Sequence, residues 1–153
     1  MSVVTRIRTS QEVTLPFPPE EVWAVLADVA AYPDWWPSAL AVEILHHEGD
    51  LLGAEFEVRP RMGRMFRIRF EELEGRRSMR LRFFGGSLEG PGGFHLHDLD
   101  GATQVRYEMD VFARGMDVAV LSQFLPLERI HQSRMRSVLH SLGSRLKKLR
   151  EAA

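Results

Sequence analysis

Alternation of apolar and polar residues in the middle of the chain constrains the fold more than any other feature of the sequence. In residues 66–71 apolar side chains alternate with charged ones, and the same period of two recurs in residues 79–84, 94–97 and 105–111. This period is typical of strands with one buried and one solvent-facing side. Short connections favour antiparallel pairing, because a parallel crossover needs about a dozen residues or more. The charged side is expected to be a solvated exterior with cross-strand ion pairs.

Helical patterns stand at both ends of this strand region. The prolines at positions 18 and 19 mark a helix start, and two glutamates follow in the first turn, where the helix dipole favours acids. A short helical segment then ends at Pro37. Glycine-bearing turns separate most of the predicted strands, which cover about residues 7–15, 39–48, 53–60, 64–74, 77–85, 87–98 and 102–113.

A long helix, from about residue 117 to 150, is the element available to cover the apolar side of the sheet. Pro126 should kink or restart it, because proline removes a hydrogen bond and clashes with the preceding turn. The sequence thus predicts an α+β fold, in which a curved seven-stranded antiparallel sheet wraps around a long C-terminal helix, with two short helices after the first strand. The apolar side of that helix comprises Leu121, Phe124, Leu125, Met135, Val138, Leu139, Leu142, Leu146 and Leu149.

Length and composition limit the class of protein. A chain of 153 residues supports one core and is too short for two, so we expect a single domain over residues 1–153. The net charge of −1 argues against nucleic-acid binding, and the absence of cysteine excludes disulfides and thiol nucleophiles. No apolar run is long enough to cross a bilayer, and the start lacks a secretion signal. We therefore expect a cytoplasmic protein without stable membrane insertion.

Three stretches of the chain resemble a known family. They are PFPPEEVWAVLADVAAYPDWWP near the start, the strand opening with Gly101, Thr103, Val105 and Tyr107, and the ending LGSRLKKLREAA. Their order and spacing resemble the START-like helix-grip superfamily, in particular its polyketide cyclase/dehydrase (SRPBCC) branch. The resemblance implies a ligand cavity between the sheet and the terminal helix. It says less about chemistry, because this fold hosts lipid carriers, hormone receptors, ring-closing enzymes and ubiquinone-binding proteins.

If the sheet arches away from the helix, its inward residues line a cavity of several hundred cubic ångströms suited to an apolar ligand. Gly90 and Gly92 would leave room inside, and a ligand oxygen would satisfy the Tyr107 hydroxyl. Of Trp35 and Trp36, one should pack in the core and the other could lie at the cavity mouth. The predicted lining residues are Trp36, Phe56, Val58, Phe66, Ile68, Leu81, Phe83, Phe94, Tyr107, Met109, Phe124 and Met135.

Polar residues interrupt the apolar side of the last helix. Glu128, His131 and Gln132 fall on or beside it, with a spacing that lets Glu128 contact the other two. A carboxylate beside an imidazole would orient it and raise its pKa, giving a general acid or base inside an apolar pocket. The alternative is an ordinary surface pair, with Glu128 at the edge once Pro126 shifts the helix phase. His131 stays inward in either case.

Other motifs predict no metal or cofactor. Glu128 to His131 matches half of a di-iron motif that lacks its second helical copy. His95 and His97 share one strand face, outside the sheet and without a third ligand. Residues 85–93 are rich in glycine but lie between two strands, which predicts a hairpin and not a phosphate-binding loop. No Gly-x-Ser-x-Gly nucleophile motif is present.

Three functions remain open. The first is a binding protein for a lipid-like, aromatic or polyketide-like small molecule. The second is an enzyme of cyclase, aromatase or dehydratase type, in which His131 moves protons, Tyr107 polarises a carbonyl and Glu128 orients the imidazole. The third is a protein-interaction module, which would present an exposed apolar patch. The sequence also leaves a homodimer possible, through a sheet edge or an apolar helix stripe.

Overall fold

Seven antiparallel strands form one sheet in the computed structural model, which describes residues 4–114 and 126–153. The strand order is β1-β7-β6-β5-β4-β3-β2, so β1 crosses over to pair with the last strand while the others follow a meander. The seven predicted strands are confirmed, with bounds that differ by a few residues. They are β1 (Val4–Leu15), β2 (Leu40–His46), β3 (Glu55–Pro60), β4 (Phe66–Glu74), β5 (Ser78–Phe84), β6 (Leu88–Asp98) and β7 (Thr103–Arg114).

The helices also follow the predicted order. After β1 come α1 (Pro19–Ala27), a 3-10 turn (Val29–Ala31) and α2 (Tyr32–Trp35), and the chain ends in α4 (Leu127–Ala152). Helix α4 begins directly after Pro126, so this proline precedes the helix and costs it no internal hydrogen bond. The part of the predicted helix before Pro126, which includes Phe124, lies outside the described residues.

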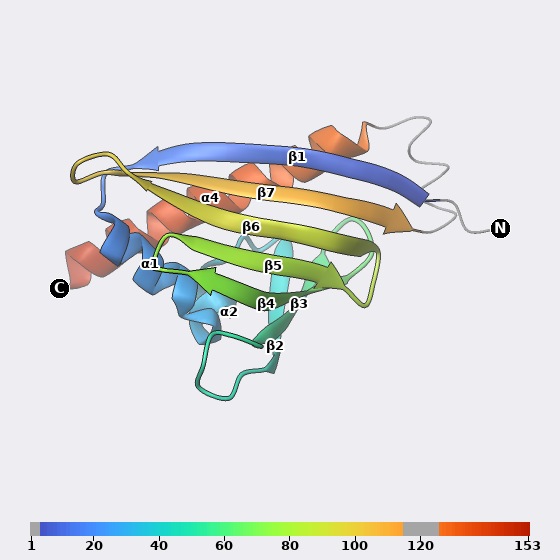
Figure 1. The fold of residues 1–153 in the computed structure, drawn as a ribbon, viewed down its shortest axis with the longest axis horizontal. Coiled ribbons are helices and arrows are strands. Elements are labelled where there is room, and N and C mark those ends of the chain that lie inside the picture. Colours follow the sequence, from blue (N-terminus) through green and yellow to red (C-terminus); the bar gives the residue numbers. More distant parts are fainter. Residues whose placement is uncertain (1–3, 115–125) are drawn as a thin grey trace.

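The sheet is strongly curved, and α4 crosses one of its faces. Figure 1 shows α4 running behind β1 and β7, while β2 and β3 lie at a steep angle to them, with α1 and α2 at the opposite end of β1 from the N-terminus. Because side chains alternate along each strand, one sheet face packs on the helices and forms the core. We call this the inner face and the charged one the outer face.

An aromatic cluster joins α2 to the inner face. The ring of Tyr32 stacks on Trp36 with centroids 5.4 Å apart, and its edge contacts with Trp35 and Phe56 measure 5.2 Å each. Both tryptophans are only 7% exposed. Both therefore pack in the core, and Trp36 also lines a small cavity between α4 and the sheet.

Ion pairs cover the outer face, as predicted. Glu57 is buried there between Arg59, at 2.5 Å, and Arg67, at 3.3 Å. The hydrogen bond from Arg59 holds the pKa of the Glu57 carboxyl below its usual range. Across the outermost strand pair, Arg6 binds Asp110 through two hydrogen bonds of 2.9 Å. Carboxylates of neighbouring strands thus offset most of the arginine charge of this face.

Candidate ligand-binding site

A small cavity lies between α4 and the inner face of the sheet. Its volume is about 10 Å³, close to the minimum that one water molecule requires. Side chains from α2, the start of β2, β4, β7 and α4 enclose it, so elements far apart in the sequence meet there. The lining residues are Trp36, Leu40, Phe66, Tyr107, Met109, His131, Arg134, Met135 and Val138.

The expected hollow of several hundred cubic ångströms between sheet and helix is absent among the described residues. Aromatic rings fill the space instead. The ring of Phe94 stacks on that of Tyr107 with centroids 4.3 Å apart, and the ring centroids of Phe66 and Phe83 are 5.8 Å apart. The room that Gly92 was expected to leave is taken by the Phe83 ring, which lies 2.6 Å from where a Cβ at position 92 would stand. The described interior is therefore closely packed.

Of the fourteen predicted site residues that lie within the described chain, the structure brings six to the cavity. Trp36, Phe66, Tyr107, Met109, His131 and Met135 line it. The remaining inner-face residues named in the sequence analysis are buried in the core without lining it, namely Phe56, Val58, Ile68, Leu81, Phe83 and Phe94.

Three lining residues were not among the predicted site residues. Val138 had a signal, because it shares the apolar side of α4. Leu40 had none beyond its position at the start of a strand. Arg134 was not singled out in the sequence, yet it also lines the cavity.

One buried polar group beside this cavity has no hydrogen-bond partner among the described residues. The Trp36 indole Nε1 is enclosed and unpaired, as is that of neighbouring Trp35, and the buried side chain of Tyr107 lines the same cavity. Burial raises the pKa of Tyr107, so its hydroxyl keeps its proton. Since buried polar groups are nearly always paired, the Trp36 N–H points to a missing partner.

His131 lies inward on α4, as expected, but its charge state differs from the expectation. Burial, together with the nearby Arg134 guanidinium, lowers the pKa of His131 to about 4. Its imidazole is therefore neutral at pH 7. The predicted rise in pKa was wrong, because Glu128 is exposed and forms no ion pair or hydrogen bond with His131. Gln132 is half-buried and does not line the cavity.

Arg134 connects the cavity to the β3–β4 loop. Its guanidinium donates a 2.5 Å hydrogen bond to the carbonyl oxygen of Met62. Gly63 permits this approach, because its φ is +126° and a Cβ there would lie 2.9 Å from the Arg134 Nη2. Burial lowers the pKa of Arg134 from its usual value.

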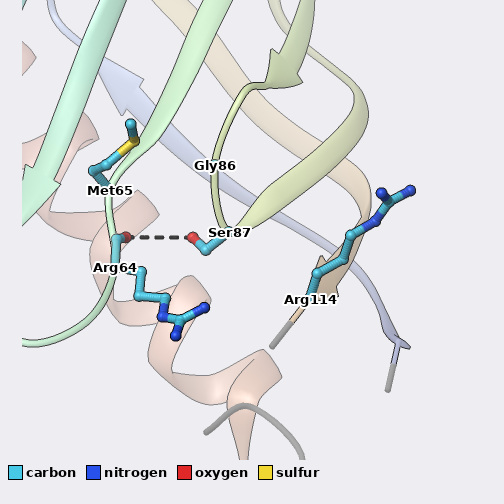
Figure 2. Close-up of a pocket in the computed structure, with 5 residues that line it drawn as sticks. All are labelled: Arg64, Met65, Gly86, Ser87 and Arg114. Atoms are coloured by element: carbon cyan, nitrogen blue, oxygen red, sulfur yellow. Dashed lines mark hydrogen bonds between the residues drawn. The ribbon is translucent and has the colours of Figure 1, made fainter. Parts of the chain in front are cut away.

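A second, larger opening lies beside the start of β4, the β5–β6 turn and the end of β7. It measures about 470 Å³ and is lined by Arg64, Met65, Gly86, Ser87 and Arg114. Figure 2 shows Ser87 between the two arginines, with its hydroxyl donating to the Arg64 carbonyl oxygen at 3.3 Å. The glycine-rich stretch forms a β5–β6 hairpin here, as predicted.

No metal site is found in the described part of the chain, where no three His, Asp or Glu side chains lie close enough to hold an ion. His95 lies on the outer face as predicted, and it contacts Glu108 at 2.7 Å and Ser78 at 3.0 Å. None of the described helices is long and apolar enough to cross a membrane.

Comparison with known proteins gives a family match over most of the chain. Residues 6–147 match the family model described as polyketide cyclase/dehydrase and lipid transport. A search of curated protein sequences found no match.

Solved structures share the fold at low sequence identity. The Zhui aromatase/cyclase from Streptomyces sp. R1128 is 20% identical, with a TM-score of 0.73 over 94% of this chain and 95% of that one. A START superfamily protein from Mycobacterium smegmatis is 14% identical, with a TM-score of 0.71 over 93% and 98%. Truncated norcoclaurine synthase from Thalictrum flavum is 13% identical, with a TM-score of 0.65 over 93% and 92%. At these identities the similarity establishes the fold alone.

Proposed function

Because the chain belongs to the polyketide cyclase/dehydrase and lipid transport family, we propose that it binds an apolar small molecule between α4 and the inner face of the sheet. The ligand class is lipid-like or aromatic, with at least one oxygen. The binding site is the cavity bounded by Trp36, Tyr107, His131 and Met135.

The observation that carries this proposal is the Trp36 indole N–H, which is buried at the cavity without a hydrogen-bond partner among the described residues. A buried polar group without a hydrogen bond costs about 1–3 kcal/mol. A ligand carbonyl or hydroxyl oxygen would accept a hydrogen bond from the Trp36 N–H and recover that free energy. Apolar walls with a few convergent polar groups are typical of small-molecule sites.

Entry of a ligand requires the cavity to widen. Two of its walls are methionines, Met109 and Met135, whose unbranched side chains change rotamer more readily than branched or aromatic ones. The ligand-free protein is in this view the closed state of an equilibrium. A ligand that binds only the open state shifts the population towards it.

Native mass spectrometry of the purified protein tests the proposal. We expect an additional small-molecule mass that dissociates under denaturing conditions. Met135→Trp, which fills the cavity, should abolish this mass, whereas Leu149→Trp, at an exposed position near the end of the same helix, should retain it. A bound mass that both variants retain, or none in the wild type, would contradict ligand binding at this site and favour the protein-interaction alternative.

The neutral imidazole of His131 favours a second function. A neutral, nearly buried histidine is a proton acceptor at pH 7, as a cyclase or dehydratase mechanism requires of a general base. Tyr107, which remains protonated, would donate a hydrogen bond to a substrate carbonyl. Glu128 is exposed and takes no part in this version. An activity whose pH–rate profile is unchanged by His131→Ala would refute it.

A further inference from the structure

Basic side chains gather around an exposed methionine at one end of the molecule. The β3–β4 loop, the β5–β6 hairpin, the end of β7 and the start of α4 all lie at this end (Figure 1). Arg61, Met62 and Arg64 come from the β3–β4 loop, and Arg114 ends β7; all four are exposed. We call these four residues the basic rim. Figure 2 shows two of them, Arg64 and Arg114, beside the larger opening.

Arg61 and Arg114 of the rim differ from the arginines of the outer face in their surroundings. On the outer face, Arg69 pairs with Glu55 at 2.8 Å and Arg82 with Glu89 at 3.5 Å. In contrast, no carboxylate of the described chain forms an ion pair with Arg61 or Arg114. Although the whole chain has a net charge of −1, this end therefore presents positive charge that its described neighbours do not neutralise.

Met62 is held in an outward position. Its side chain is 81% exposed, the highest value among the large apolar residues described. The hydrogen bond from Arg134 to the Met62 carbonyl fixes the loop, and the left-handed backbone at Gly63 turns the chain beside that guanidinium. An apolar side chain displayed between two arginines matches the boundary between lipid headgroups and acyl chains, where apolar and cationic groups are both favoured.

We propose that the basic rim docks the protein on membranes that contain anionic lipids. Arg61 and Arg114 contact lipid phosphates, and Met62 enters the headgroup region. The apolar tip favours a lipid surface over a nucleic acid, since a phosphate backbone offers no apolar layer. This docking is peripheral and goes beyond the cavity proposal, because vesicle binding needs no ligand in the cavity.

The other basic end of the molecule is a weaker candidate. Arg150, near the end of α4, pairs with Glu21 at 2.9 Å and lies over the ring of Phe17 at 4.3 Å. The charge of Arg150 is therefore already paired with groups of the protein itself. The acidic β6–β7 turn, with Asp98 and Asp100, belongs to the opposite end of the sheet from the rim and would oppose docking there.

Co-sedimentation with lipid vesicles tests the proposal. We expect the full chain to bind vesicles of phosphatidylcholine mixed with phosphatidylglycerol, to bind less as salt rises, and to leave pure phosphatidylcholine unbound. The double variant Arg61→Gln/Arg114→Gln should lower the partition coefficient about 25-fold, or about fivefold for each arginine. The matched control, Arg76→Gln/Arg77→Gln in the exposed β4–β5 turn at the opposite end, changes the net charge equally and should bind like the wild type.

A second pair of variants tests the apolar contact while leaving every charge in place. Met62→Gln should weaken binding to the mixed vesicles, whereas Leu99→Gln, at an exposed position in the β6–β7 turn, should not. Failure of the wild type to bind the mixed vesicles would overturn the proposal. An equal loss in the rim variants and their controls would also overturn it, because it would show only nonspecific attraction.

Discussion

The buried histidine of α4 makes a quantitative prediction about stability against acid. His131 is 7% exposed, and its pKa falls from 6.5 to about 4 on folding. The unfolded chain therefore binds this proton more tightly than the folded one, and acid favours unfolding. The stabilisation linked to His131 is fully present above pH 6.5 and is lost as the pH falls towards 4.

The size of the effect follows from the two pKa values. Relative to neutral pH, protonation of the unfolded state removes about 2 kcal/mol of stability by about pH 5 and about 3 kcal/mol by about pH 4. Urea denaturation across this range measures the free energy of unfolding. The quantity to compare is the difference between wild type and His131→Gln, because the contributions of the carboxylates cancel in it.

We expect the free energy of unfolding of the wild type, minus that of His131→Gln, to fall by about 3 kcal/mol between neutral pH and about pH 4, since glutamine at position 131 does not titrate. His140→Gln, on the exposed side of α4, is the matched control and removes one histidine without changing the cavity. A difference between wild type and His131→Gln that stays constant from neutral to acid pH would show that the imidazole is not desolvated, and would refute the reasoning. The same result would contradict the proposal that a neutral His131 acts as a general base at the cavity.

Two further predictions concern packing and a buried hydrogen bond. Gly92→Ala should destabilise the fold by about 1–3 kcal/mol, because the new methyl group meets the ring of Phe83. The control Gly143→Ala should cost less, because its methyl group meets only the flexible side chain of Leu15. Equal urea midpoints for the two variants would contradict the close packing around Gly92. Thr103→Val should cost about 1–3 kcal/mol, because it leaves the carbonyl oxygen of Phe17 without its 2.7 Å hydrogen bond. A Thr103→Val midpoint like that of the wild type would show that water replaces the hydroxyl.

The fold could be predicted because its signals are local. Strand faces follow from a period of two, and turns follow from glycine positions, so each strand was found without knowledge of its partner. The start of α4 follows from Pro126, which fixes a helix boundary wherever the chain lies. The crossover that pairs β1 with β7 has no such local signal, and it was not predicted.

The site could be predicted only in part, because a cavity depends on how side chains from distant elements fit together. Periodicity identifies the inner face, but it does not say that the Phe83 ring lies over Gly92 and fills the space beside it. Helix projection places His131 inward and leaves the rotation of α4 open by about one residue, which is enough to put Glu128 in solvent. The same rotation brings Arg134 to the cavity. A positive charge there lowers the pKa of His131, whereas the predicted carboxylate would have raised it, so a small change in helix orientation reverses the expected charge state of the site.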